Sequence, residues 1–233
     1  DYSNWLSAPM IRPVKVHVED TYVATGDTVM VAVDVIVPLD TSIISAELRL
    51  TGFQNHLNVV SVETGQGLAG AAGWSLATNA TDTSLFIAAA GANPVSGTGT
   101  LLWVKLAAPD TAAGSVVPVN VANAVFDDGS FGYNAKNGSV TIIQPLVVDF
   151  TLSPDSGAYP LQVSFTSSTT GENIDEYTWN FGDGMMSHDV NPVHTFMRPG
   201  DFSVSLTCRD VYGSSSTELK SNVVSIDTLF GDV

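Results

Sequence analysis

Apolar and polar residues alternate in short runs along most of this chain. Val14, Val16 and Val18 open the pattern, which is typical of strands that bury one face. Turn residues such as Gly, Asp, Asn and Pro separate the runs, and no stretch has the period of an amphipathic helix. The pattern predicts an all-β protein made of many short strands, which is typical of β-sandwiches.

The run from 29 to 37 has valine at every second position. Met30, Ala32 and Ile36 on its opposite face are also apolar, so we expect this strand to be buried on both faces or covered by a loop. The small-residue stretch 65–73 is expected to form a loop. Further strands are expected at 44–50, 57–62, 74–76, 85–90, 101–106, 116–121, 125–126 and 140–143.

Gln144-Pro145 marks the predicted hinge, because proline cannot donate to a strand ladder and the alternation restarts directly after it. In the second region Tyr177, Trp179 and Phe181 place three aromatic rings on one face of a strand, and a Gly-Asp-Gly turn ends it. The sequence thus predicts a lead segment at 1–13, a larger β-sandwich at 14–144 and a smaller one at 145–233.

Acidic residues outnumber basic ones by 24 to 8, which gives a formal net charge of −16. Such a surface repels phosphate backbones and anionic lipid heads, so neither nucleic acid nor a membrane surface is an expected partner. The longest apolar run is interrupted by Asp34 and is far shorter than the roughly 20 residues of a spanning helix. Because the chain starts at Asp1 rather than Met, we expect a mature, secreted protein that is extracellular or held at the cell surface.

Cys208 is the only cysteine, which excludes an internal disulfide and cysteine-based zinc sites. It continues the alternation of Phe202, Val204 and Leu206, so we expect it to be a buried core residue rather than a reactive thiol.

The second region resembles the PKD family of immunoglobulin-like modules. The matching residues cover 146–227 in order and are Val148-Asp149-Phe150, Pro160 to Thr166, Trp179 to Gly184 (WNFGDG), Asn191 to Phe196, and Pro199-Gly200. Asn180 stands where the family commonly has aspartate, which weakens any calcium role there. The resemblance implies a non-catalytic extracellular module that serves as a spacer or contacts proteins or polysaccharide.

The first region looks like a cohesin, the jelly-roll sandwich of cellulosome scaffolds and related surface proteins. The residues that carry this resemblance are Gly26 to Val29, Ile44 to Leu50, Leu57 to Val62, Leu101 to Leu106, Phe126 to Gly129 and Asn137 to Ile142. The resemblance implies a docking domain. It carries no partner-contacting residue over to this chain, because recognition surfaces vary within the family.

Catalytic motifs are weak. Gly65 to Gly70 spells a dinucleotide fingerprint, but that motif needs a helix after it, and a strand-like run is expected instead. His17, His56, His188 and His194 show no HExxH spacing, and His194 is expected to pack or bond beside the aromatic strand. We therefore expect no enzyme and no catalytic residue.

Acidic pairs in this sequence favour solvated turns. Glu19-Asp20, Asp127-Asp128 and Asp175-Glu176 would need a defined separation across a cleft to hydrolyse a glycoside. Asp127-Asp128-Gly129 and Asp183 offer oxygens to calcium, although not with the spacing of an EF-hand, so calcium stays open and no ligand set is assigned.

Two sequons begin at Asn79 and Asn137. In a secreted protein from an organism that glycosylates, both would be surface loops that carry sugar, and otherwise they would be plain turns.

Three functions compete. The first is self-assembly into a surface filament or layer, with Trp5, Leu6, Met10 and Ile11 of the lead added to a neighbour's sheet edge. The second is a cohesin-type receptor that docks a dockerin-like partner. The third is a polysaccharide-binding accessory of a secreted hydrolase, which would need Trp74, Trp103 and Tyr133 in an exposed row.

Overall fold

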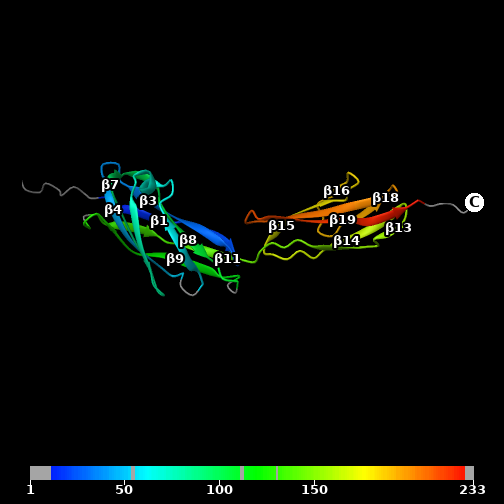
Figure 1. The fold of residues 1–233 in the computed structure, drawn as a ribbon, viewed down its shortest axis with the longest axis horizontal. Coiled ribbons are helices and arrows are strands. Elements are labelled where there is room, and N and C mark those ends of the chain that lie inside the picture. The colour runs from blue at the N-terminus through cyan, green and yellow to red at the C-terminus, as the bar shows by residue number, and fades with distance from the viewer. Residues whose placement is uncertain (1–11, 54–55, 111–112, 130, 229–233) are drawn as a thin grey trace, which may run out of the picture. The chain divides into compact units, whose positions relative to one another are not determined.

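The structure is a computed structural model that describes residues 12–53, 56–110, 113–129 and 131–228. The chain forms two compact units, one ending at Ile143 and the other beginning at Gln144 (Figure 1). Both units are built almost entirely from β-strands, which confirms the all-β prediction. Within the described residues, no helix is long and apolar enough to cross a membrane.

The first unit is a sandwich of two sheets. One sheet has five strands in the order β10-β1-β3-β8-β5. These strands are Tyr133–Lys136, Val14–Val18, Thr28–Val37, Gly97–Ala107 and Asn58–Glu63. The other sheet has six strands in the order β2-β11-β9-β4-β7-β6. These strands are Thr21–Ala24, Gly138–Ile143, Val116–Phe126, Ile43–Thr51, Leu85–Val95 and Ser75–Ala80.

In each sheet of this unit, an N-terminal strand pairs with a C-terminal strand. β1 pairs in parallel with β10, and β2 pairs in parallel with β11, so the stretch 14–24 passes from one sheet to the other. The remaining ladders between the described strands of this unit are antiparallel. The expected jelly-roll sandwich is confirmed.

The core of the first unit lies between its two sheets. In β3, Val31, Val33 and Val35 are buried there, as their alternation predicts. The expectation that the second face of β3 is buried or covered by a loop is wrong, because Met30 is 40% exposed and Ile36 is 43% exposed. Each sheet of a sandwich has one inner and one outer face, and these two side chains point outward.

Two local predictions for the first unit are also wrong. The stretch 65–73 is not only a loop, because it contains the single-turn helix α1, Leu68–Ala71, whose Ala69 is buried. The stretches 116–121 and 125–126 are not two strands, because both belong to β9. A bulge at Ala122 breaks the alternation within β9, and Asn137 Oδ1 accepts a hydrogen bond from Val121 N at 2.9 Å beside it.

The second unit is a smaller sandwich. Its three-stranded sheet has the order β12-β14-β17, and its five-stranded sheet has the order β13-β19-β18-β15-β16. In these orders the strands are Phe150–Ser153, Leu161–Ser167 and Val193–Phe196, then Ser156–Ala158, Ser215–Asp227, Gly200–Asp210, Ile174–Asn180 and Met186–Ser187. The expected immunoglobulin-like sandwich is confirmed.

Aromatic rings fill the core of the second unit. Trp179 and Phe181 are buried and Tyr177 is half-buried against the same core, as their spacing predicts. The Trp179 ring meets Phe150 edge to face at 5.1 Å between ring centroids. Cys208 is fully buried among these residues, which confirms its expected place in the core.

Candidate functional site

The outer surface of the six-stranded sheet carries a row of small and apolar side chains. Cross-strand pairing places Ala77 of β6 beside Ala88 of β7, which lies beside Glu47 of β4. The next row in the same register joins Asn79, Phe86 and Arg49. We call this surface the alanine face and define it by Glu47, Arg49, Ala77, Asn79, Phe86, Ala88 and Ala90.

Two shallow hollows lie on the alanine face. The larger has a volume of about 510 Å³, and its lining includes Arg49, Ala77, Phe86 and Asn123. The second, of about 280 Å³, lies toward Ser45, Ser75 and Ala90. Because alanine and serine leave little side chain above the sheet, larger neighbours such as Phe86 form the walls.

Arg49 is held in one place on this face. Its Nε donates to Ser84 Oγ at 3.0 Å, and its guanidinium carbon lies 5.2 Å from the centroid of the Phe86 ring. Ser84 is only 1% exposed, so the acceptor is anchored in the sandwich. Phe86 itself is 42% exposed. Arginine and aromatic side chains are both enriched at protein interfaces.

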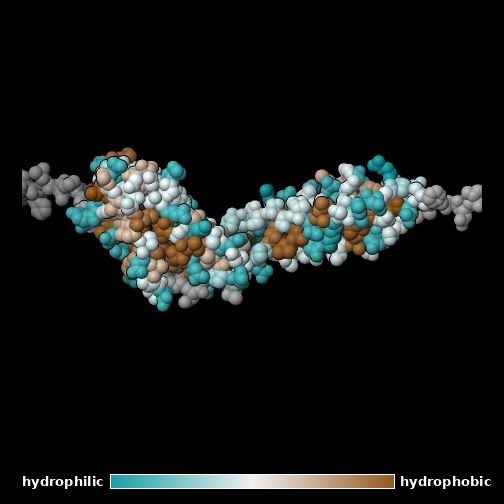
Figure 2. Space-filling view, viewed as in Figure 1, coloured by the Kyte–Doolittle hydropathy of each residue, from teal (hydrophilic) through white to brown (hydrophobic). Residues whose placement is uncertain are grey.

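Exposed apolar side chains occur in both units (Figure 2). In the second unit, Met185 and Met197 border a hollow of about 460 Å³ beside His194 and Phe202. His194 stacks on Phe181 at 4.1 Å between ring centroids, which confirms its expected place beside the aromatic strand.

The carboxylates considered for calcium are engaged by the protein itself. Asp127 Oδ1 accepts hydrogen bonds from the backbone N–H groups of Ile44 at 2.8 Å and Ser45 at 3.0 Å. Asp183 Oδ1 accepts from Met185 N, and its Oδ2 pairs with His194 Nε2 at 2.8 Å. Across the described ranges, no group of three or more His, Cys, Asp or Glu residues is arranged to hold a metal ion.

The glycines of the dinucleotide-like stretch 65–70 allow close packing of the chain, because a side chain there would collide with its neighbours. A side chain at Gly67 would lie 2.9 Å from the Trp103 ring, and one at Gly70 would lie 2.0 Å from the carbonyl oxygen of Gly65. The helix α1 begins within this stretch and has only four residues, which is too short to present a pyrophosphate site.

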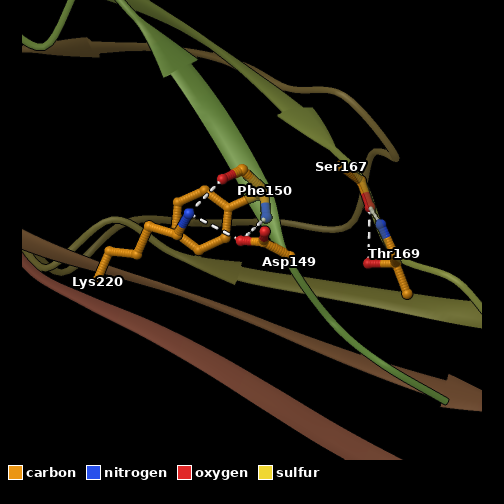
Figure 3. Close-up of polar contacts among 5 residues, drawn as sticks. All are labelled: Asp149, Phe150, Ser167, Thr169 and Lys220. Carbon is orange, nitrogen blue, oxygen red and sulfur yellow. Dashed lines mark hydrogen bonds and ion pairs between the residues drawn. The ribbon is translucent and has the colours of Figure 1, made fainter.

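Lys220 of β19 makes polar contacts that join the two sheets of the second unit (Figure 3). Its ammonium donates to the Phe150 carbonyl oxygen at 2.6 Å and pairs with Asp149 Oδ1 at 2.8 Å. It also lies 4.8 Å from the centroid of the Phe150 ring. Hydrogen bonds from Lys220 and from Phe150 N hold the pKa of the Asp149 carboxyl below its ordinary value.

The thiol of Cys208 lies 3.6 Å from Thr169 Oγ1. Figure 3 shows that this hydroxyl in turn accepts a hydrogen bond from Ser167 Oγ. Burial raises the pKa of this thiol, so it stays protonated and unreactive at neutral pH.

The other sites predicted from the sequence lie apart from one another. Asn79 is exposed in the edge strand β6 and not in a loop, whereas Asn137 lies between β10 and β11. Trp74 is buried, and Tyr133 packs against the core. Trp5, Leu6, Met10 and Ile11 lie outside the described residues.

Sequence reasoning missed Arg49 and Phe86 as candidate site residues. A signal was present, because Leu85, Phe86 and Ile87 are consecutive apolar residues. Neighbouring side chains of a strand point to opposite faces, so a strand with one buried face leaves at least one of these three outside the core.

Two β-sandwich units that follow one another along the chain define a modular β-sandwich protein. A family model for the cohesin domain matches residues 14–142, which is more than half of the chain. The chain therefore belongs to the cohesin family, and a family model for the PKD domain matches residues 147–226 after it. Both resemblances inferred from the sequence are confirmed.

Solved cohesins share the fold of the first unit. The seventh ScaB type I cohesin of Pseudobacteroides cellulosolvens is similar with a TM-score of 0.51 and 16% identity, covering 59% of this chain and 96% of that chain. The Coh-OlpA–Doc918 type I cohesin–dockerin complex of Clostridium thermocellum is similar with a TM-score of 0.50 and 15% identity, covering 57% of this chain and 100% of that chain.

Curated relatives match only a short stretch. Collagenase ColA of Bacillus cereus is 40% identical over 68 residues, and the pre-pro-metalloprotease PrtV of Vibrio cholerae is 36% identical over 63 residues. These alignments cover 28% and 27% of this chain but only 7% of each relative.

Proposed function

We propose that this chain is a non-catalytic, extracellular docking protein whose cohesin domain binds a dockerin-like partner through the alanine face. The observation that carries the proposal is the fixed pair of Arg49 and Phe86 beside a hollow of about 510 Å³. A cohesin of the same fold occurs in complex with a dockerin, which supports a protein partner of that class.

The chemistry of the alanine face specifies what the partner presents. The hollow over Ala77 and Ala88 accepts apolar side chains, because its floor is made of methyl groups. Arg49 adds a planar donor fork that suits a carboxylate or a carbonyl oxygen of the partner.

Substitution of Phe86 tests this proposal. We expect Phe86→Asp to weaken binding of dockerin modules at least tenfold, because it removes the apolar wall and the ring that supports Arg49. Isothermal titration calorimetry against a panel that starts with Doc918 measures the effect. The matched control is Val60→Asp, which adds the same charge at an exposed valine of β5 in the other sheet. Equal losses in both variants, or no binding by any dockerin, would contradict the proposal.

Self-assembly stays a prediction, since the lead residues proposed to mediate it lie outside the described residues. The polysaccharide-binding alternative is weaker, because Trp74 is 5% exposed and Tyr133 packs against the core, which leaves no exposed aromatic row with Trp103.

A further inference from the structure

Free strand edges are templates for pairing with another chain, and proteins blunt them with short strands, bulges, proline or charge. Among the described strands, those at the sheet edges are β10, β5, β2, β6, β12, β17, β13 and β16. Six of these have four residues or fewer, so their edges are short.

Only β5 and β6 among these edge strands have six residues. β5 is blunted, because its register shifts between Val59 and Ser61 and it ends in Glu63. β6 has none of these devices. Its sequence from Ser75 to Ala80 carries no charge and no proline, and it pairs with β7 in unbroken register.

The edge of β6 is also uncovered. Five of its six residues are exposed and Leu76 is half-buried, so most of the strand is open to solvent.

We propose that β6 pairs with β6 of a second copy of this chain, antiparallel about a two-fold axis, so that the two six-stranded sheets become continuous. With Ala77 on the axis, each residue meets one that points to the same side of the sheet. Ser75 then lies opposite Asn79 of the second copy, and Leu76 lies opposite Thr78 of the second copy. No pair in this register sets like charges against each other.

The absence of charge on β6 lowers the repulsion that a second copy would meet at this edge. Each chain carries a net charge of −16, so most orientations of two copies repel. The uncharged β6 is a place where two copies meet without facing carboxylates. Because the strand is short, the pairing supplies only about six backbone hydrogen bonds. We therefore expect a weak dimer that strengthens with salt as the overall repulsion is screened.

A charge-swap experiment on the full chain tests the pairing. Sedimentation velocity from micromolar to millimolar protein should show a concentration-dependent dimer of the natural chain. Ala77→Lys and Ala77→Glu should each be monomeric, because two like charges then meet at the axis. An equimolar mixture of the two variants should dimerise again. This recovery cannot arise from misfolded protein, so it separates lost pairing from lost folding.

Asn123→Lys is the matched control. It adds a charge to the same outer surface on the interior strand β9, and we expect it to leave the dimer intact. A natural chain that stays monomeric at millimolar concentration would overturn the proposal. So would a dimer that persists in Ala77→Lys, or a mixture that fails to associate. The test requires no dockerin, so its result is independent of docking at the alanine face.

Discussion

Lys220 joins the two sheets of the second unit through three contacts of a single side chain. It extends from β19 across to the start of β12, where it meets a carbonyl oxygen, a carboxylate and an aromatic ring at once (Figure 3). The carbonyl contact does not depend on pH, whereas the ion pair requires an ionised Asp149.

Lys220→Met should destabilise the second unit, and the destabilisation should shrink in acid. The folded pKa of Asp149 lies below its ordinary value of 3.8, so the ion pair stabilises the fold fully above that value. This contribution is lost as pH falls through the folded pKa. Thermal unfolding of the full chain between neutral pH and pH about 3 measures the gap between variant and natural chain. A gap of constant size would show that only the carbonyl and ring contacts matter.

At the residue scale, the sequence predicted the core roles well and the surface roles poorly. Cys208 and His194 were placed correctly, because alternation and a specific motif fixed their faces. For Asp127, the sequence left open whether the carboxylate binds calcium or lies in a solvated turn. Its actual role, an acceptor for two backbone N–H groups of β4, depends on a contact more than 80 positions away in the chain.

At the scale of elements, Asp127 joins the end of β9 to the start of β4. Its φ is +55°, a left-handed conformation that asparagine tolerates better than alanine. Its carboxylate satisfies the N–H groups of Ile44 and Ser45 at the register shift of β4.

Asp127→Ala should therefore lower the free energy of unfolding of the first unit by about 2 kcal/mol, since it removes the acceptor of two backbone donors. Asp127→Asn keeps an acceptor oxygen and the left-handed preference, so it should cost much less. Urea titrations followed by circular dichroism measure both. Equal losses would mean that the charge, and not hydrogen-bond geometry, is what matters.

Strands with clean alternation were predictable, and irregular ones were not. The valines of β3 identified its buried face, but an apolar outer face was mistaken for a second buried one. β19 runs from Ser215 to Asp227, but its first half is polar and is held in the sheet by pairing with β18. Cross-strand pairing of this kind is invisible to a local pattern.

At the scale of the whole molecule, the chain contains two separate hydrophobic cores. One is rich in valine and leucine, and the other is built around Trp179 and its neighbouring rings. Cys208 belongs to the second core and reports on that unit alone.

Leu48→Ala should destabilise only the first unit. Leu48 is buried, so its truncation should cost about 3 kcal/mol. The change should lower the urea midpoint of the first unit and leave the midpoint for thiol labelling of Cys208 unchanged. If the urea midpoint for Cys208 labelling fell together with the midpoint of the first unit, the two units would unfold as one.

The candidate docking surface could not be assembled from sequence. Arg49, Ala77 and Phe86 belong to three different strands, and only the register of the six-stranded sheet makes them neighbours. The family resemblance predicted a docking domain but left its surface open.

The position of Lys220 has a mechanical consequence. β12 and β19 are the first and last strands of the second unit, so tension applied between the two ends of this unit loads both of them. The contacts of Lys220 with Asp149 and Phe150 tie these two strands together and lie in the path of that load. Tension on the second unit would thus load this ion pair together with the backbone ladders that β19 forms with β13 and β18.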